Sequence, residues 1–198
     1  MISLHTESGF SLVETLVAIT ILLLVIVGPM SISSSVSRST SYSSDQVIAS
    51  FLAQEGAELV QKARDDLQLQ YYTGEVSTPW DDFVSTDSSS RYSDCFESDG
   101  CGLYLINSSD QLADTIDCAG SRCRLFFRGQ SNTDSYTHRQ GSGSTVTPYT
   151  RVIKLSHPSS GSEDREVEVI SRVSWQPENQ RRVQTVEVKT YLFNVYEN

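Results

Sequence analysis

The sequence predicts an α+β protein in which a long N-terminal helix, membrane-embedded in its first half, packs on a C-terminal antiparallel β-sheet. Three observations lead to this fold class. Residues 10–30 form a mainly apolar stretch whose only charged residue is Glu14. Residues 46–68 carry apolar side chains at helical spacings of three and four. After residue 149 the sequence alternates between apolar and polar residues, which is typical of half-buried strands.

Composition limits the classes of protein that fit. The chain has 198 residues, of which 38% are hydrophobic, and this is too apolar for a disordered chain and too polar for a multi-span membrane protein. Lys and Arg total 15 against 25 for Asp and Glu, which makes the formal net charge −10. Since a negative field repels phosphate groups, we expect no general nucleic-acid binding.

The apolar segment is long enough to span a membrane. A helix over residues 10–30 is about 30 Å long at a rise of about 1.5 Å per residue, which matches the hydrocarbon thickness of a bilayer. A cleaved signal peptide, cut near Ser34, is the alternative. Two features argue against it: residues 1–9 contain no Lys or Arg, and the carboxylate of Glu14 lies inside the apolar run.

Residues 9–14 read GFSLVE and run directly into the apolar helix, a combination that closely resembles the N-terminus of type IV pilins and pseudopilins. The resemblance implies that a prepilin peptidase cuts between Gly9 and Phe10, removes leader residues 1–9 and methylates the new amine of Phe10. It also implies that Glu14, the fifth mature residue, acts in filament assembly. Leaders of this family are usually basic, and this one departs from that pattern.

The outer end of the apolar segment carries Gly28 and Pro29. Proline lacks an N–H and crowds the preceding turn, so we expect a helix break there. The serine-rich residues 31–44 are consistent either with a flexible linker or with a continuing helix. The resemblance favours the second, which makes residues 31–69 a continuation of the N-terminal helix.

Asp45 is predicted to cap the N-terminus of the amphipathic helix over residues 46–68. Its apolar stripe is expected to dock onto the sheet. The stripe consists of Ile48, Phe51, Leu52, Leu59, Val60, Ala63 and Leu67.

A globular head is predicted over residues 70–198. Its first part offers short strands at residues 102–106 and 124–127 and a polar exposed loop at residues 129–147. Its C-terminal part predicts a meander of three strands over residues 150–155, 166–175 and 182–196, the last two joined as a hairpin through residues 176–180. The faces expected to point inward carry Ile153, Leu155, Val167, Val169, Val173, Trp175, Val186, Val188 and Leu192.

All four cysteines fall in the head, at positions 95, 101, 118 and 123. Outside the membrane thiols tend to be oxidised, so we expect disulfides Cys95–Cys101 and Cys118–Cys123, with a nested pairing as the alternative. The spacings within each pair are wider than those of zinc sites, so no metal site is predicted.

The sequence offers no catalytic motif and implies no cofactor. His138 and His157 lie in polar sequence and are expected at the surface. The acidic residues Asp94, Glu97 and Asp99 are expected to form a solvated loop. A small basic group on strand edges is formed by Arg122, Arg124 and Arg128.

The resemblance therefore predicts a non-enzymatic structural subunit of a type IV pilus-like filament. Its partners would be the prepilin peptidase, other pilin subunits, the inner-membrane assembly machinery and, before assembly, the cytoplasmic membrane, which the chain would cross once. After assembly the subunit would lie in an extracellular pilus. The alternatives are a periplasmic pseudopilin of a type II secretion or DNA-uptake system, and an anchored binding protein that does not polymerise.

Overall fold

The computed structural model describes residues 9, 11–105, 113–120, 122–129, 134–158, 165–177 and 181–195. The chain divides into two compact units, Met1–Ser44 and Asp45–Asn198. Its helices are α1 (Leu12–Thr73), α2 (Pro79–Val84) and the 3-10 helix η1 (Ser93–Phe96). The strands are β1 (Cys101–Tyr104), β2 (Asp114–Asp117), β3 (Arg124–Arg128), β4 (Ser135–Thr137), β5 (Ser144–Ser156), β6 (Glu166–Trp175) and β7 (Gln184–Phe193).

Helix α1 includes the serine-rich segment, which resolves the choice between linker and helix. Side-chain hydroxyls there donate to carbonyl oxygens one turn earlier, as Thr40 does to Val36 at 3.0 Å and Ser43 to Ser39 at 2.9 Å. These bonds let a hydroxyl-rich sequence remain helical without leaving its own polar groups unpaired.

The prediction that Asp45 caps a helix is wrong, because Asp45 lies inside α1. Its carboxylate instead accepts a hydrogen bond from the hydroxyl of Tyr149 on β5 at 3.2 Å. Asp45 therefore accepts a hydrogen bond from a residue distant in the sequence rather than from the backbone N–H groups at a helix N-terminus.

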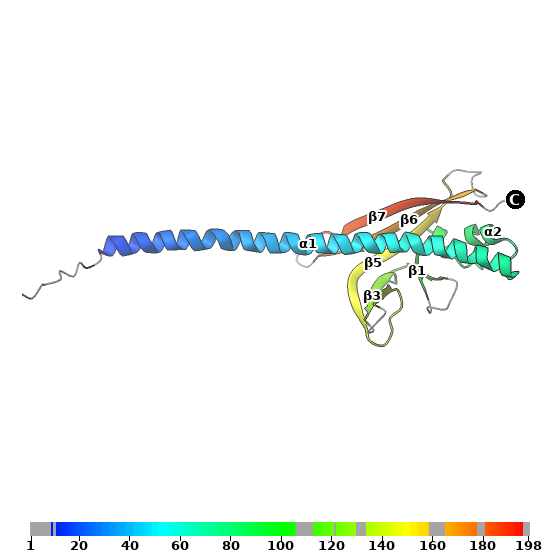
Figure 1. Cartoon of the computed structure of the whole chain (residues 1–198), viewed down its shortest axis with the longest axis horizontal. Coiled ribbons are helices and arrows are strands. Elements are labelled where there is room, and N and C mark those ends of the chain that lie inside the picture. The colour runs from blue at the N-terminus through cyan, green and yellow to red at the C-terminus, as the bar shows by residue number, and fades with distance from the viewer. Residues whose placement is uncertain are drawn as a thin grey trace, which may run out of the picture. The chain divides into compact units, whose positions relative to one another are not determined.

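A seven-stranded sheet is built around β5. One edge of β5 pairs with β6, which in turn pairs with β7, and the other edge pairs with both β1 and β3. Strand β2 extends the sheet beyond β1, and β4 extends it beyond β3. All these pairings are antiparallel, so the α+β class with a C-terminal antiparallel sheet is confirmed. Figure 1 shows α1 from Asp45 onward lying across this sheet.

The three predicted C-terminal strands are confirmed as β5, β6 and β7. The pairing of Trp175 with Gln184 closes the predicted β6–β7 hairpin. Burial alternates along both strands as the sequence pattern requires, with Val167 and Leu192 buried opposite each other.

The predicted exposed loop over residues 129–147 is wrong in part. This stretch contributes β4 and the first residues of β5, and both pair with β3 through Phe126↔Thr137 and Phe127↔Thr145. Local sequence is a weak guide here because strand formation depends on the neighbours that supply ladder hydrogen bonds and packing. The predicted strands at residues 102–106 and 124–127 correspond to β1 and β3.

The buried face of α1 contacts two apolar clusters in the second unit. The first contains Ala49, Leu52, Ala53, Leu125, Tyr149, Val173 and Trp175. The second contains Val60, Ala63, Leu67, Phe83, Leu103, Ile153 and Val167 among others. Phe51, predicted to share this stripe, is 66% exposed. At about 100° per residue it lies roughly a quarter turn away from Leu52, outside the face that the sheet covers.

Gly56 lies on the buried face of α1 and allows a close approach to the sheet. A Cβ atom at this position would lie 2.2 Å from the Oγ of Ser171 on β6 and 3.0 Å from the Cδ of Arg151 on β5. The missing side chain therefore leaves room for Arg151 to run between the helix and the sheet.

Candidate functional site

The predicted cleavage site lies just before α1. Gly9 is exposed and has no regular secondary structure, and Phe10 falls outside the described residues. The first helical turn is closed by the amide of Thr15, which donates to the carbonyl of Ser11 at 3.1 Å. The bond after Gly9 thus precedes the first residue of α1, Leu12.

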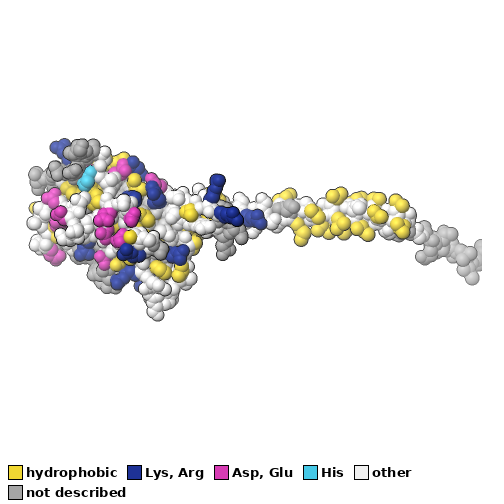
Figure 2. Space-filling model, turned by 180° about the vertical axis from the view of Figure 1, so that it is seen from behind, with side chains coloured by type: hydrophobic (Ala, Val, Ile, Leu, Met, Phe, Trp, Pro, Cys, Tyr) yellow, Lys and Arg dark blue, Asp and Glu magenta, His cyan; other side chains and the backbone are white. Residues whose placement is uncertain are grey.

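The first unit presents an apolar surface along its described residues. Described side chains from Ser11 to Met30 are exposed, and most are large aliphatic residues. On the visible face in Figure 2, hydrophobic side chains follow this part of α1, whereas charged side chains gather over the second unit. By length and composition α1 contains a segment apolar enough to cross a membrane. A continuous apolar surface of this extent indicates lipid or protein as its neighbour.

Among the described residues of the first unit, Glu14 lies far from any Lys or Arg side chain. Arg38 is the nearest Lys or Arg among the described residues of the first unit. Along a helix the two are about 36 Å apart, at a rise of about 1.5 Å per residue. Phe10 lies outside the described residues, and the expected role of Glu14 in assembly stays a prediction.

Helix α1 continues through Gly28 and Pro29. Pro29 has no N–H to donate to the carbonyl of Val25, so one helical hydrogen bond is missing at this point. The expected helix break at Gly28 and Pro29 is wrong for this structure, because α1 runs through both residues with the loss of this one hydrogen bond.

The second unit encloses a buried cation, Arg151 of β5. Its Nη1 donates to the carbonyl of Leu52 at 3.2 Å and to Oε2 of Glu55 at 2.9 Å, and its Nη2 donates to the carbonyl of Leu103 at 3.4 Å. Burial lowers the pKa of Arg151, and the Glu55 carboxylate opposes this shift. The guanidinium therefore links α1 to β5 and β1 from inside the fold.

The sequence pattern contained a signal for Arg151 that the prediction missed. Ile153 and Leu155 were assigned to the inward face of their strand, and the same period of two places Arg151 on that face. A basic residue at an inward position indicates a buried ion pair or a ligand contact.

His138 corrects the expectation that the histidines lie at the surface. It is only 3% exposed. Burial, together with the positive charge of Arg151, lowers the pKa of His138 to about 3. His157 is half-buried, and its ring stacks on Phe96 with centroids 5.1 Å apart.

Disulfides join Cys95 to Cys101 and Cys118 to Cys123. The first links η1 to β1 inside the larger apolar cluster, where both sulfurs are fully buried. The second ties the end of β2 to the start of β3. Neither pair leaves a thiol for metal binding.

The charged groups singled out in the sequence have separate environments. Among the described residues, no cluster of three or more potential ligands could hold a metal ion, and this includes the acidic residues near Asp94. Arg122 pairs with Asp117 at 2.9 Å, and Arg124 is exposed. Arg128 is half-buried and lines a cavity described below.

The comparisons with known proteins agree with the N-terminal pattern. The family model described as the prokaryotic N-terminal methylation motif matches residues 4–28. No curated protein and no solved structure matched the chain. The matched segment contains Gly9, Phe10, Glu14 and Gly28, so the chain carries the signature shared by type IV pilins and pseudopilins.

Proposed function

We propose that this chain is a structural subunit of a type IV pilus-like extracellular filament. The observation that carries the proposal is the coincidence of the methylation motif at residues 4–28 with the exposed apolar part of α1, residues 12–30, whose only charged residue is Glu14. The family of this motif is structural, so the chemistry is performed on the chain by a prepilin peptidase, which cuts after Gly9 and methylates Phe10.

The apolar part of α1 serves in two environments. Before assembly it lies in the cytoplasmic membrane, where lipid covers its aliphatic side chains. In the filament the same side chains pack against the helices of other subunits. Because lipid and protein are about equally favourable for an aliphatic surface, apolar packing alone sets no unique stagger between subunits.

Glu14 specifies the stagger between subunits that apolar packing leaves undetermined. An unpaired carboxylate in hydrocarbon costs several kcal/mol, so it requires a proton or a cationic partner. The methylated amine of Phe10, about one helical turn away, is the nearest such group in sequence. Pairing between Glu14 and the amine of a neighbouring subunit fixes the axial register of the filament.

A pseudopilin of a type II secretion or DNA-uptake system is the second candidate, because the same motif serves both classes. The two differ in where the assembled subunit is found. A subunit recovered in sheared surface fractions supports the pilus, whereas one confined to the periplasm supports the pseudopilus.

The proposal is tested by the N-terminus of the mature chain. The chain is expressed with a prepilin peptidase and examined by intact mass and N-terminal sequencing. We expect a start at methylated Phe10, and we expect Gly9→Val, or omission of the peptidase, to leave the leader attached. A mature start near Ser34 would identify a signal peptide and overturn the proposal.

A further inference from the structure

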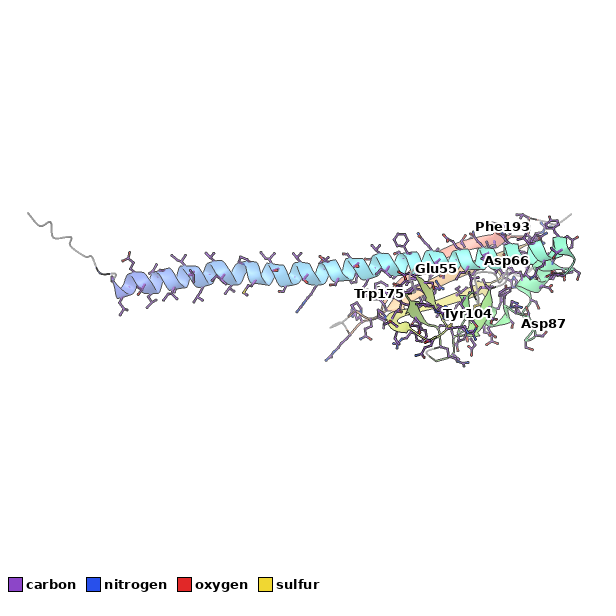
Figure 3. The ribbon with its side chains drawn as sticks, turned by 60° about the horizontal axis from the view of Figure 1, so that its bottom comes forward. Glu55, Asp66, Asp87, Tyr104, Trp175 and Phe193 are labelled. Atoms are coloured by element: carbon purple, nitrogen blue, oxygen red, sulfur yellow. A yellow bond between two sulfur atoms is a disulfide. The ribbon has the colours of Figure 1, made fainter. Side chains whose placement is uncertain are left out.

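The second unit contains a cavity of about 340 Å³ beside the buried Arg151. It lies between α1, the end of β1, the strands β3 and β4, and the turn that follows β4. Its charged and aromatic lining consists of Glu55, Arg128, Arg139, Arg151, Tyr104 and Tyr136. In Figure 3, Glu55 is labelled on α1 and Tyr104 on the sheet, and both residues line the cavity.

The cavity is cationic although the protein as a whole is acidic. Three guanidinium groups line it against the single carboxylate of Glu55, which is already paired with Arg151 at 2.9 Å. Within the described parts of the chain, no carboxylate forms an ion pair with Arg128 or Arg139. The net charge of the chain is −10, so this excess of positive charge is local.

Two of the guanidinium groups have donors that the protein leaves unused. The Nε atoms of Arg128 and Arg151 are buried and have no hydrogen-bond partner among the described residues. Buried N–H groups are normally paired, since an unpaired donor loses its hydration without compensation. The hydrogen bonding of Arg128 and Arg151 is thus incomplete among the described residues.

The surrounding residues fix where the cations lie. A Cβ atom at Gly141 would be 2.7 Å from Nη2 of Arg128, so the absence of a side chain lets that guanidinium lie against the turn. The Cζ of Arg139 lies 5.5 Å from the centroid of the Tyr104 ring, and the Tyr104 hydroxyl donates to Asp114 at 3.1 Å. Arg128 and Arg139 are thus positioned by packing before any ligand arrives.

The size and chemistry of the cavity define the ligand class. Planar guanidinium groups suit the oxygens of a carboxylate or a phosphate, and aromatic walls suit a ring. Ser135, Thr137 and Gln140 add hydroxyl and amide groups to the lining. Small-molecule sites usually measure about 300–1,000 Å³, so this cavity suits a small ligand.

We propose that this cavity binds a sugar ring that carries one carboxylate or one phosphate group. The guanidinium groups of Arg128 and Arg139 hold the anionic group, and the hydroxyl and amide groups meet the ring. The site lies wholly within the second unit and does not depend on the proposed role in a filament.

The test is a binding titration on the full mature chain, held in a detergent without a sugar headgroup. The probes are D-glucuronate, glucose 6-phosphate and D-glucose, and calorimetry measures their affinities. We expect at least one charged probe to bind about tenfold or more tightly than glucose, because a charge-assisted contact is lost with the neutral sugar. Comparison of the two charged probes separates a carboxylate ligand from a phosphate ligand.

Variants separate a specific site from general attraction. We expect Arg128→Gln and Arg139→Gln each to weaken binding about tenfold, and Gly141→Ala to weaken it by displacing Arg128. Arg124→Gln is the matched control, because it removes the same charge from the same strand outside the lining. Arg139 is exposed, so its variant keeps the test valid if Arg128→Gln fails to fold.

Three results overturn the proposal: no charged probe binds, glucose binds as tightly as the charged probes, or Arg124→Gln weakens binding as much as Arg128→Gln.

Discussion

Arg151 on β5 and Glu55 on α1 form an ion pair with very unequal exposure. The Arg151 side chain is 1% exposed and that of Glu55 42%, with 2.9 Å between Nη1 and Oε2. A fully buried guanidinium thus forms an ion pair with a carboxylate at the surface. The pair joins the helix to the centre of the sheet, at a point where Gly56 makes room for it.

Glu55→Gln is expected to destabilise the second unit by about 1–3 kcal/mol. Breaking a fully buried pair costs about 3–5 kcal/mol, and the exposure of the Glu55 carboxylate reduces this figure. The measurement is urea unfolding of the full chain in detergent, followed by the fluorescence of Trp80 and Trp175. Glu58→Gln, an exposed carboxylate on the same helix, is the control and should change the stability by less than about 0.5 kcal/mol. Equal effects of the two substitutions would contradict a structural role for the pair.

Gly56→Ala is expected to lower the free energy of unfolding of the second unit by about 1–3 kcal/mol, because overpacking outweighs the better helix propensity of alanine. Ser171→Ala should rescue part of this loss, since it removes the Oγ that lies 2.2 Å from the new Cβ and leaves the Ser171 Cβ at 3.3 Å. Gly28→Ala is the control, because nothing lies within 4 Å of its new Cβ. A Gly56→Ala protein as stable as the parent would show that α1 and β6 are less closely packed than the structure indicates.

His138 predicts that the stability of the second unit falls with acidification. Its pKa is about 3 in the folded protein, below the ordinary value of 6.5, so the unfolded chain binds the proton more readily. Its contribution is fully present above about pH 6.5 and is lost as pH falls toward 3, on the order of 3 kcal/mol by pH 4. The measurement compares unfolding free energies of the parent and His138→Gln from pH 7 to 4.

As pH falls, the unfolding free energy of the parent should decrease more than that of His138→Gln. The carboxylates titrate in both proteins, so their effect cancels in the comparison. Parallel profiles for the parent and His138→Gln would refute the assignment of His138 as a buried neutral group.

Non-reducing peptide mapping should link Cys95 to Cys101 and Cys118 to Cys123. Each loop is short, so closure contributes about 2 kcal/mol by chain entropy. Replacing Cys95 and Cys101 by alanine should cost more than replacing Cys118 and Cys123. The first pair is fully buried in the larger apolar cluster, where the substitution also removes packing. Four free thiols in protein recovered from outside the cell would rule out both disulfide bonds.

Glu14→Val is expected to insert in the membrane and to be cut after Gly9, yet to form no filaments as the sole subunit. Valine satisfies the apolar environment but offers no partner for the amine that sets the register. Membrane fractionation, intact mass and filament imaging measure the three steps. Thr15→Val, which replaces the adjacent polar residue with one of the same shape, should assemble normally. Filaments of normal number and length from Glu14→Val would remove the proposed role.

Local sequence patterns were sufficient to predict the N-terminal helix and the C-terminal strands. The methylation motif at residues 4–28 and the apolar run behind it are contiguous. The strands β6 and β7 and the second half of β5 follow from a period of two, and the docking face of α1 follows largely from a period of 3.6. Each of these features depends on residues within a few positions of one another, so the sequence alone determined them.

Only the tertiary structure showed which partners the polar and charged residues have. The sequence pattern suggested a helix cap at Asp45, but the structure pairs its carboxylate with Tyr149 of β5. The pattern also suggested an exposed His138, but its ring is buried against Gly102 of β1. Arg151 and Glu55 are separated by 96 positions in the sequence. Periodicity predicts which face of an element points inward, but the partner of a side chain on that face depends on which distant element packs there.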